Sequence, residues 1–136
     1  MSLFGPLGAS ASGIDAAQTW IDAIAGNVAN SNDVASVGQS VYQEQEPILT
    51  PTGATGPGQI GDGVAVSGVA LGSAAGTVES DPGSVLANSQ GLVRVPNVDL
   101  AQQMTNLIQA QDTYQANTAA LQRAITAYQS ALTLGS

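Results

Sequence analysis

The chain has 136 residues, a length that fits one domain or one small domain carried on helical arms. Charged residues make up 9% of it: ten acids stand against Arg94 and Arg123, without any lysine or histidine, and the net charge is −8. This composition excludes nucleic-acid binding, which needs a basic patch to neutralise phosphates, and it disfavours binding to an anionic membrane.

The sequence also disfavours a cleaved secretory signal and a membrane span. The first basic side chain is Arg94, so residues 1–33 cannot supply the basic region of a cleaved secretory signal. The longest apolar runs are too short for a membrane span. The absence of cysteine removes disulfides and zinc thiolates. We therefore expect no membrane span and, if the chain is exported, a route without a cleaved leader.

The first predicted element is a helix from about Gly13 to Ala29, within an N-terminal arm of residues 1–33. Gly5-Pro6 is expected to break any earlier helix, and Ser12 has the character of an N-cap. Residues 30–33 should end the helix, because short polar side chains compete for backbone hydrogen bonds. One helix face carries apolar residues at heptad spacing: Ile14, Ala17, Ile21, Ile24 and Val28.

Residues 34–96 have a different character, since they hold eleven of the sixteen glycines and five of the six prolines. Thr50 to Gly63 is predicted as a loop, and Asp81-Pro82-Gly83 as a turn. Residues 77–79 are expected to pair with the best strand, 64–71, which is rich in β-branched residues. Extended segments are predicted at 41–45, 48–49, 64–71 and 91–95. This region should form a small, mostly antiparallel β element.

The last predicted element is a long helix from Val98 to Thr133, within a C-terminal part of residues 97–136. Asn97 or Asp99 can cap its start, and Gly135 suits its end. Ten positions follow alternating steps of four and three residues, and they form a heptad seam: Leu100, Met104, Leu107, Gln111, Tyr114, Thr118, Leu121, Ile125, Tyr128 and Leu132.

The other faces of this long helix are rich in alanine and nearly free of charge. A lone exposed helix usually carries pairs of opposite charges, so we expect more than one face to be covered in the working state. An intramolecular hairpin with an exposed alanine-rich face remains open. The predicted fold is mainly α with a small β element: N- and C-terminal helices packed as a coiled coil, with short antiparallel strands between them.

No group of residues indicates catalysis. Without histidine and cysteine, the chain lacks the commonest general base, nucleophile and soft metal ligands. Glu79 and Asp81 could form a carboxylate pair, but a turn explains Asp81 without chemistry. Asp62 and Glu79 lack the spacing of a calcium-binding loop. We predict a protein that is not an enzyme, with no catalytic residue, no cofactor and no metal site.

Several motifs resemble those of the bacterial flagellar basal-body rod proteins, and most of all the short proximal rod protein of that family. These are residues 95–100 followed by Met104, Tyr114-Gln115-Ala116-Asn117, and a terminal Leu132-Thr133-Leu134-Gly135. Asn27-Val28-Ala29-Asn30 is similar to the Asn-x-Ala-Asn signature of the rod and hook proteins. The resemblance extends over almost the whole chain. One departure is Gln103, where the family commonly has an acidic residue before the methionine.

The resemblance implies a structural subunit of the proximal rod, which assembles through terminal coiled-coil helices and transmits torque across the periplasm. It also implies export by the flagellar type III apparatus without signal cleavage. The expected partners are other rod proteins and copies of the same chain, with membrane ring and export gate proteins as further candidates. The predicted assembly residues are Ile14, Ile21, Ile24, Asn27, Val28, Asn30, Asn97, Leu100, Met104, Leu107, Tyr114, Asn117, Leu121, Ile125, Tyr128 and Leu132.

The alternative reading of the same seams is a secreted helical-hairpin interaction protein that acts as a soluble dimer. Both readings predict two helices and no cleaved leader. They differ in the isolated chain, where a rod subunit should have disordered terminal arms and a hairpin should be stably helical.

Overall fold

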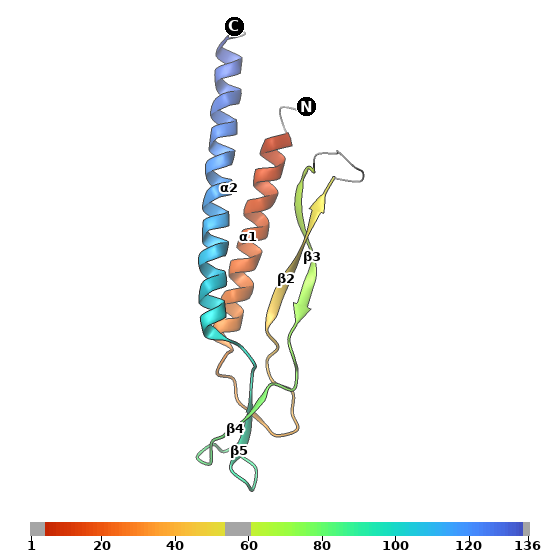
Figure 1. Cartoon of the computed structure of the whole chain (residues 1–136), viewed down its shortest axis with the longest axis vertical. Coiled ribbons are helices and arrows are strands. Elements are labelled where there is room, and N and C mark those ends of the chain that lie inside the picture. The colour runs from red at the N-terminus through yellow and green to blue at the C-terminus, as the bar shows by residue number, and fades with distance from the viewer. Residues whose placement is uncertain (1–4, 54–60, 135–136) are drawn as a thin grey trace. The chain divides into compact units, whose positions relative to one another are not determined.

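The computed structural model describes residues 5–53 and 61–134, and in these residues it holds two helices and five strands (Figure 1). Helices stand at both ends of the described chain, and short antiparallel strands in two small sheets lie between them, as the sequence predicts. The packing of the helices as a coiled coil remains a prediction. The elements are α1 (Gly5–Ala29), β1 (Ala35–Ser36), β2 (Gln45–Thr52), β3 (Gly63–Leu71), β4 (Thr77–Ser80), β5 (Leu92–Val95) and α2 (Leu100–Leu134).

The chain divides into two compact units that both helices enter. Among the described residues, unit 1 consists of 5–21, 47–53, 61–68 and 108–134. Unit 2 consists of 22–46 and 69–107. The three parts predicted from the sequence, 1–33, 34–96 and 97–136, therefore each contribute to both units.

The first helix is longer than predicted, because it begins at Gly5 and not near Gly13. Pro6 is tolerated there, since the first turn of a helix leaves its N–H groups without intrahelical partners. Ser12 consequently lies inside the helix and is not its N-cap. Its hydroxyl donates to the Ala9 carbonyl at 2.9 Å and accepts the backbone N–H of Val64 at 3.1 Å. The predicted stop after Ala29 is confirmed.

The strand pairing differs from the prediction for β4. It pairs antiparallel with β5, with Glu79 opposite Val93 and Val78 opposite Arg94, so the expected pairing of 77–79 with 64–71 is wrong. The nine-residue β3 pairs instead with the eight-residue β2, a partner that matches its length. The predicted loop from Thr50 is also too long at its start, because β2 continues to Thr52.

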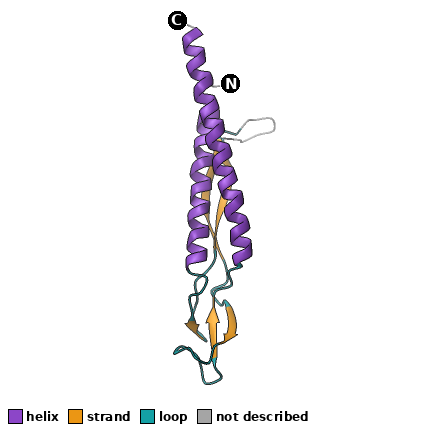
Figure 2. Cartoon of the chain, turned by 90° about the vertical axis from the view of Figure 1, so that its left-hand side faces the viewer, coloured by secondary structure: helices purple, strands orange, loops and turns teal. Residues whose placement is uncertain are grey.

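The second sheet has the strand order β1-β5-β4, and residues 81–91 connect β4 to β5; the strands are drawn in orange in Figure 2. The predicted turn at Asp81-Pro82-Gly83 is present, and Ser84 N–H donates to the Asp81 carbonyl at 3.2 Å. Asp81 N–H donates to the Gly91 carbonyl at 2.9 Å and extends the ladder of β4 and β5. This local closure explains why β4 joins β5.

The apolar core of the described residues is small. Its six fully buried apolar residues include three alanines, and the largest fully buried side chains are Gln103, Val93 and Asn27. Many large apolar side chains are exposed instead. They lie on β2, β3 and β4, in loops next to strands, and on α2. The single chain therefore buries little of its apolar surface, and the rest is available for burial on association.

Gly76 offers a test of the packing of unit 2. Its φ is +54°, and a Cβ at this position would meet the Val95 carbonyl oxygen and Val41 Cγ2. We expect Gly76→Ala to destabilise the sheet by about 3 kcal/mol, because positive φ and a clash with backbone add up. Amide hydrogen exchange of β5 measures this loss. Gly83→Ala is the matched control: it meets only ordinary contacts and should leave the exchange of β5 unchanged.

Candidate assembly interface

The predicted seam of the long helix lies on α2, and each of its two columns is partly exposed. In the first column (Leu100, Leu107, Tyr114, Leu121 and Tyr128), Leu107, Leu121 and Tyr128 are half-buried, whereas Leu100 is 44% and Tyr114 38% exposed. In the second column (Met104, Gln111, Thr118, Ile125 and Leu132), Met104 is 51%, Ile125 42% and Leu132 58% exposed, Gln111 is exposed, and Thr118 is half-buried. The seam is thus only partly covered within the single chain.

The column that the chain does cover is a different one. Gln103 is 1% exposed and Ala110 is 0% exposed, and Asn117 and Ala124 are half-buried. Each lies one residue before a member of the predicted second column, which is a rotation of about 100° around the helix. The covered stripe therefore consists of two alanines and two side-chain amides, while Met104, Ile125 and Leu132 in the neighbouring column stay on the surface. The heptad spacing of these four residues is a sequence signal for the stripe.

The seam of α1 behaves in the opposite way. Ala17 and Ile24 are buried, and Ile14, Ile21 and Val28 are half-buried. The apolar face of α1 is therefore used largely within the chain. Of the two predicted seams, it is α2 that offers an apolar surface to a partner.

Asn27, a predicted assembly residue, lies inside unit 2 and is 1% exposed. Its Nδ2 donates to the Gln45 carbonyl and to Gln103 Oε1, both at 2.9 Å. Its Oδ1 accepts the backbone N–H of Gln45 at 2.8 Å and the Tyr42 hydroxyl at 3.0 Å. All the hydrogen-bonding capacity of this amide is thus filled within the chain. Any role of Asn27 in assembly would be indirect, through the placement of its neighbours.

Gln103 links this amide to a carboxylate. Its Oε1 accepts from Asn27, and its Nε2 donates to Glu44 Oε1 at 2.5 Å. A glutamine side chain can do both at once, because it carries a donor and an acceptor. Burial, and secondarily the charge of Glu44, raise the pKa of Tyr42 above its ordinary value.

The remaining polar residues of the predicted interface act at helix ends or on α2. Asn30 Nδ2 donates to the Gly26 carbonyl at 2.7 Å and thereby closes the end of α1. Asn97 is exposed, and Asp99 is the residue that caps α2, because its Oδ1 accepts the N–H groups of residues 101 and 102. Asn117 Nδ2 donates to the Thr113 carbonyl. The expected helix end at Gly135 lies outside the described residues.

The close approach of α1 and α2 in unit 1 occurs at Gly13. A Cβ built on Gly13 would lie 2.6 Å from Asn117 Oδ1. A glycine is therefore needed here for the two helices to come this close, which agrees with the small residues of the covered column on α2.

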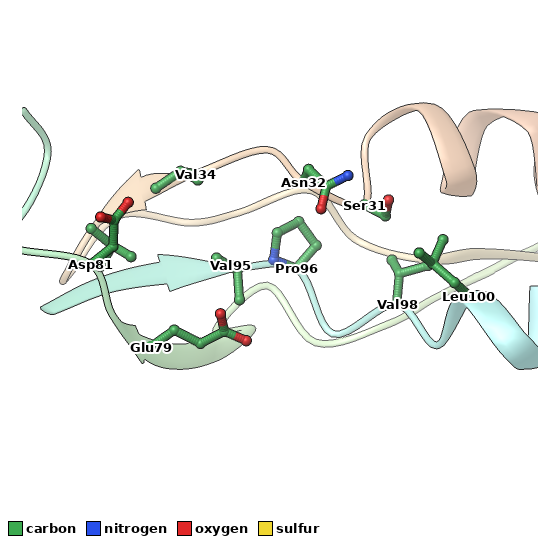
Figure 3. Close-up of a pocket in the computed structure, with 10 residues that line it drawn as sticks. Ser31, Asn32, Val34, Glu79, Asp81, Val95, Pro96, Val98 and Leu100 are labelled. Carbon is green, nitrogen blue, oxygen red and sulfur yellow. The ribbon is translucent and has the colours of Figure 1, made fainter. Parts of the chain in front are cut away.

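Unit 2 also carries an open groove of about 370 Å³, which no sequence signal predicts (Figure 3). Glu79 and Asp81 lie on one side of it, and Pro96 and Val98 come from the segment that follows β5. In residues 5–53 and 61–134 no cluster of side chains suits a metal ion, and neither helix is long and apolar enough to cross a membrane. The groove is lined by Ser31, Asn32, Val34, Glu79, Asp81, Val93, Val95, Pro96, Val98 and Leu100.

Comparison with known proteins identifies the family. Residues 89–134 match the family model described as flagellar basal body rod FlgEFG protein C-terminal. The FlgC rod protein of Yersinia enterocolitica is 32% identical over 135 residues, which cover 99% of each chain. The chain belongs to the FlgC family of flagellar basal-body rod proteins. The FlgC protein of Salmonella typhimurium LT2 is 30% identical over 99% of this chain and 99% of its own length. The FlgC protein of Bacillus subtilis 168 is 29% identical over 89% of this chain and 90% of its own length.

The family match confirms the resemblance stated from the sequence motifs. A FlgC relative is a structural subunit of the flagellar basal-body rod, in a family that is not an enzyme family. The region matched by the family model begins before β5 and contains all of α2. It therefore includes Gln103, the covered column and the exposed column. No relative in the comparison supports the alternative of a soluble hairpin dimer.

The pair formed by Gln103 and Glu44 yields a prediction about pH. Gln103→Glu places a second carboxylate against Glu44, and two carboxylates this close cannot both be ionised at low cost. We expect a loss of about 2–4 kcal/mol in unfolding free energy at neutral pH. The loss should shrink as the pH falls below about 5, where one carboxyl group takes a proton. Urea unfolding at both pH values measures it.

The matched control for this prediction is the double variant Gln103→Glu/Glu44→Gln. It exchanges the amide and the carboxylate between the two positions and restores one donor opposite one acceptor. We expect its stability at neutral pH to return close to that of the parent chain. A single variant as stable as the parent at neutral pH would contradict the observed pairing.

Tyr42 yields a prediction at alkaline pH. Because the pKa of Tyr42 is raised in the folded chain above its ordinary value of 10.0, the folded chain keeps a proton that the unfolded chain loses. This stabilisation is complete below pH 10 and is lost as the pH rises through the raised pKa. Tyr42→Phe should flatten the fall in stability and cost about 1 kcal/mol at neutral pH.

Proposed function

We propose that the chain is a structural subunit of the proximal rod, which assembles with copies of itself and with other rod proteins through its terminal helices. In this proposal the exposed column of α2 packs as a coiled coil against helices of neighbouring subunits. The interlocked helices carry torque across the periplasm. The observation that supports it best is the apolar column that α2 leaves on the surface.

The apolar character of this surface favours burial in an assembly. Its apolar members remain exposed in the single chain: Met104 is 51% exposed, Ile125 42% and Leu132 58%. Full burial of such a side chain is worth roughly 1.5–3 kcal/mol relative to full exposure. Half-exposed side chains therefore retain about 1 kcal/mol each for an interface, before the cost of association is counted.

The charge pattern of α2 supports the same proposal. Its 35 residues contain Asp112 and Arg123 as their charged side chains. Helices of a chain with net charge −8 would repel one another if the acids were placed along the contact. Because α2 is almost free of acids, several copies can pack side by side, and the repulsion is kept to other parts of the chain.

Family membership supports placement in the flagellar basal body. We infer a periplasmic location and type III export without signal cleavage. Besides the other rod proteins, the membrane ring and the export gate are candidate partners. Gln103 and Asn27 would contribute to assembly by setting which face of α2 is available, and not by contact with a neighbour.

Substitution in the exposed column tests this function. Ile125→Asp should abolish rod assembly and swimming in cells that carry it as their only copy, because a charge would be buried without a partner. The stability of the purified chain should change by less than about 0.5 kcal/mol, since the position is exposed in the single chain. Swimming in soft agar and electron microscopy of basal bodies provide the readouts.

Gln122→Asp is the matched control, because it adds the same charge to an exposed position of α2 outside the seam. It should leave rods and swimming intact. Normal rods with Ile125→Asp would contradict the role of the column. Leu121→Asp, at a half-buried position, should abolish assembly and also weaken the isolated chain.

A further inference from the structure

β4 is an edge strand with unused backbone groups. It is the outer strand of the order β1-β5-β4, all four of its residues are exposed, and no strand in the described part of the chain pairs with its other side. Asp81 N–H bonds to the Gly91 carbonyl, so alternation along an antiparallel ladder turns the backbone groups of Glu79 toward β5. Those of Val78 and Ser80 then point outward, where an added strand can use them.

The acidic groove borders this edge. Glu79 lies opposite Val93 in the register, and Asp81 is two residues further along, so their side chains share one face of the sheet with Val93 and Val95. The same residues line the groove, together with Pro96 (Figure 3). The groove thus combines apolar side chains with polar ones, among them two carboxylates, next to the outward-facing backbone groups of Val78 and Ser80.

Charge decides which partner fits. No basic residue lines the groove. The chain's own cations are Arg94, whose Nη1 donates to the Gln39 carbonyl at 3.3 Å, and Arg123 on α2. Arg94 lies opposite Val78 and therefore on the other face of the sheet from Glu79. A second copy carries a net charge of −8 over its whole chain and offers only two arginines as cationic side chains. A different, basic protein suits it better.

We propose that this groove is a second interface, which receives an extended segment of a different protein as an added strand on β4. The segment carries arginine or lysine at alternate positions, so that the aliphatic stems contact apolar lining residues such as Val95 and Pro96, and the cationic heads meet Glu79 and Asp81. This proposal rests on the proposed function, in which the chain is a rod subunit with several neighbours. It specifies the chemistry of one of these neighbours.

Peptide binding to the full chain tests the groove. The probe is a fluorescent, end-blocked peptide Thr-Arg-Val-Arg-Val-Arg-Thr, and the same peptide with glutamine for arginine is the reference. Anisotropy at low salt should show binding of the arginine peptide alone. Glu79→Gln/Asp81→Asn should weaken binding about tenfold or more, since two charge-assisted bonds are lost. Asp22→Asn/Asp112→Asn removes the same charge at exposed positions and should leave the affinity unchanged.

The edge of β4 is tested separately by Val78→Pro. Proline removes an N–H that the folded sheet leaves unused, so the chain keeps its fold while strand addition is blocked. Binding should again fall about tenfold or more. If hydrogen exchange shows that this variant unfolds, the Glu79→Gln/Asp81→Asn variant still decides the matter.

Three results would overturn the proposal. One is equal loss of affinity in the Asp22→Asn/Asp112→Asn control, which would mean attraction by net charge alone. Another is equal binding of the glutamine peptide. The third is self-association of the full chain that Val78→Pro abolishes, which would assign the groove to a second copy. Ile125→Asp leaves the groove residues in place and should bind the peptide normally, so failure of the groove and failure of the rod function can be told apart.

Discussion

The buried side-chain amide of Asn27 is the interaction on which the rest of unit 2 depends. Its carboxamide is bonded to the backbone of Gln45, to Tyr42 and to Gln103, and a buried amide left unpaired would cost roughly 1–3 kcal/mol. These bonds hold Gln103 inward. Because successive helix residues are about 100° apart, an inward Gln103 turns Met104 toward the surface. A hydrogen bond within the chain thus determines which face of α2 is left for a partner.

The composition of the core is consistent with one face of α2 being buried within the chain and another being left exposed. The residues that α2 buries in the single chain are small or polar, such as Ala110 and Gln103, while Ile108 and Leu132 remain exposed. A small core stabilises the single chain only modestly, because hydrophobic stabilisation grows with the apolar area removed from water. The apolar area that is not used within the chain is then available to an assembly, which suits a protein whose working state is a polymer.

The two candidate interfaces differ in chemistry. The exposed column of α2 is apolar and almost without charge, so it suits the helices of similar chains. The groove beside β4 combines Glu79 and Asp81 with apolar side chains such as Val95 and Pro96, so it suits a basic partner. Like charges disfavour wrong partners and opposite charges favour right ones. With its acids kept away from α2, one short chain can present both kinds of surface.

Local patterns in the sequence were enough to predict the course of α2, the end of α1 and the turn at Asp81-Pro82-Gly83, because each depends on residues a few positions apart. They also limited the cap of α2 to Asn97 or Asp99, and the structure assigns it to Asp99. The motifs were enough to predict the family. Only the tertiary structure decided the early start of α1, the pairing of β4 with β5, the covered column of α2 and the groove. These depend on contacts between distant residues, such as Ser12 with Val64 and Asn27 with Gln103. Heptad spacing shows that a stripe will be buried, but such contacts determine which stripe the chain buries itself.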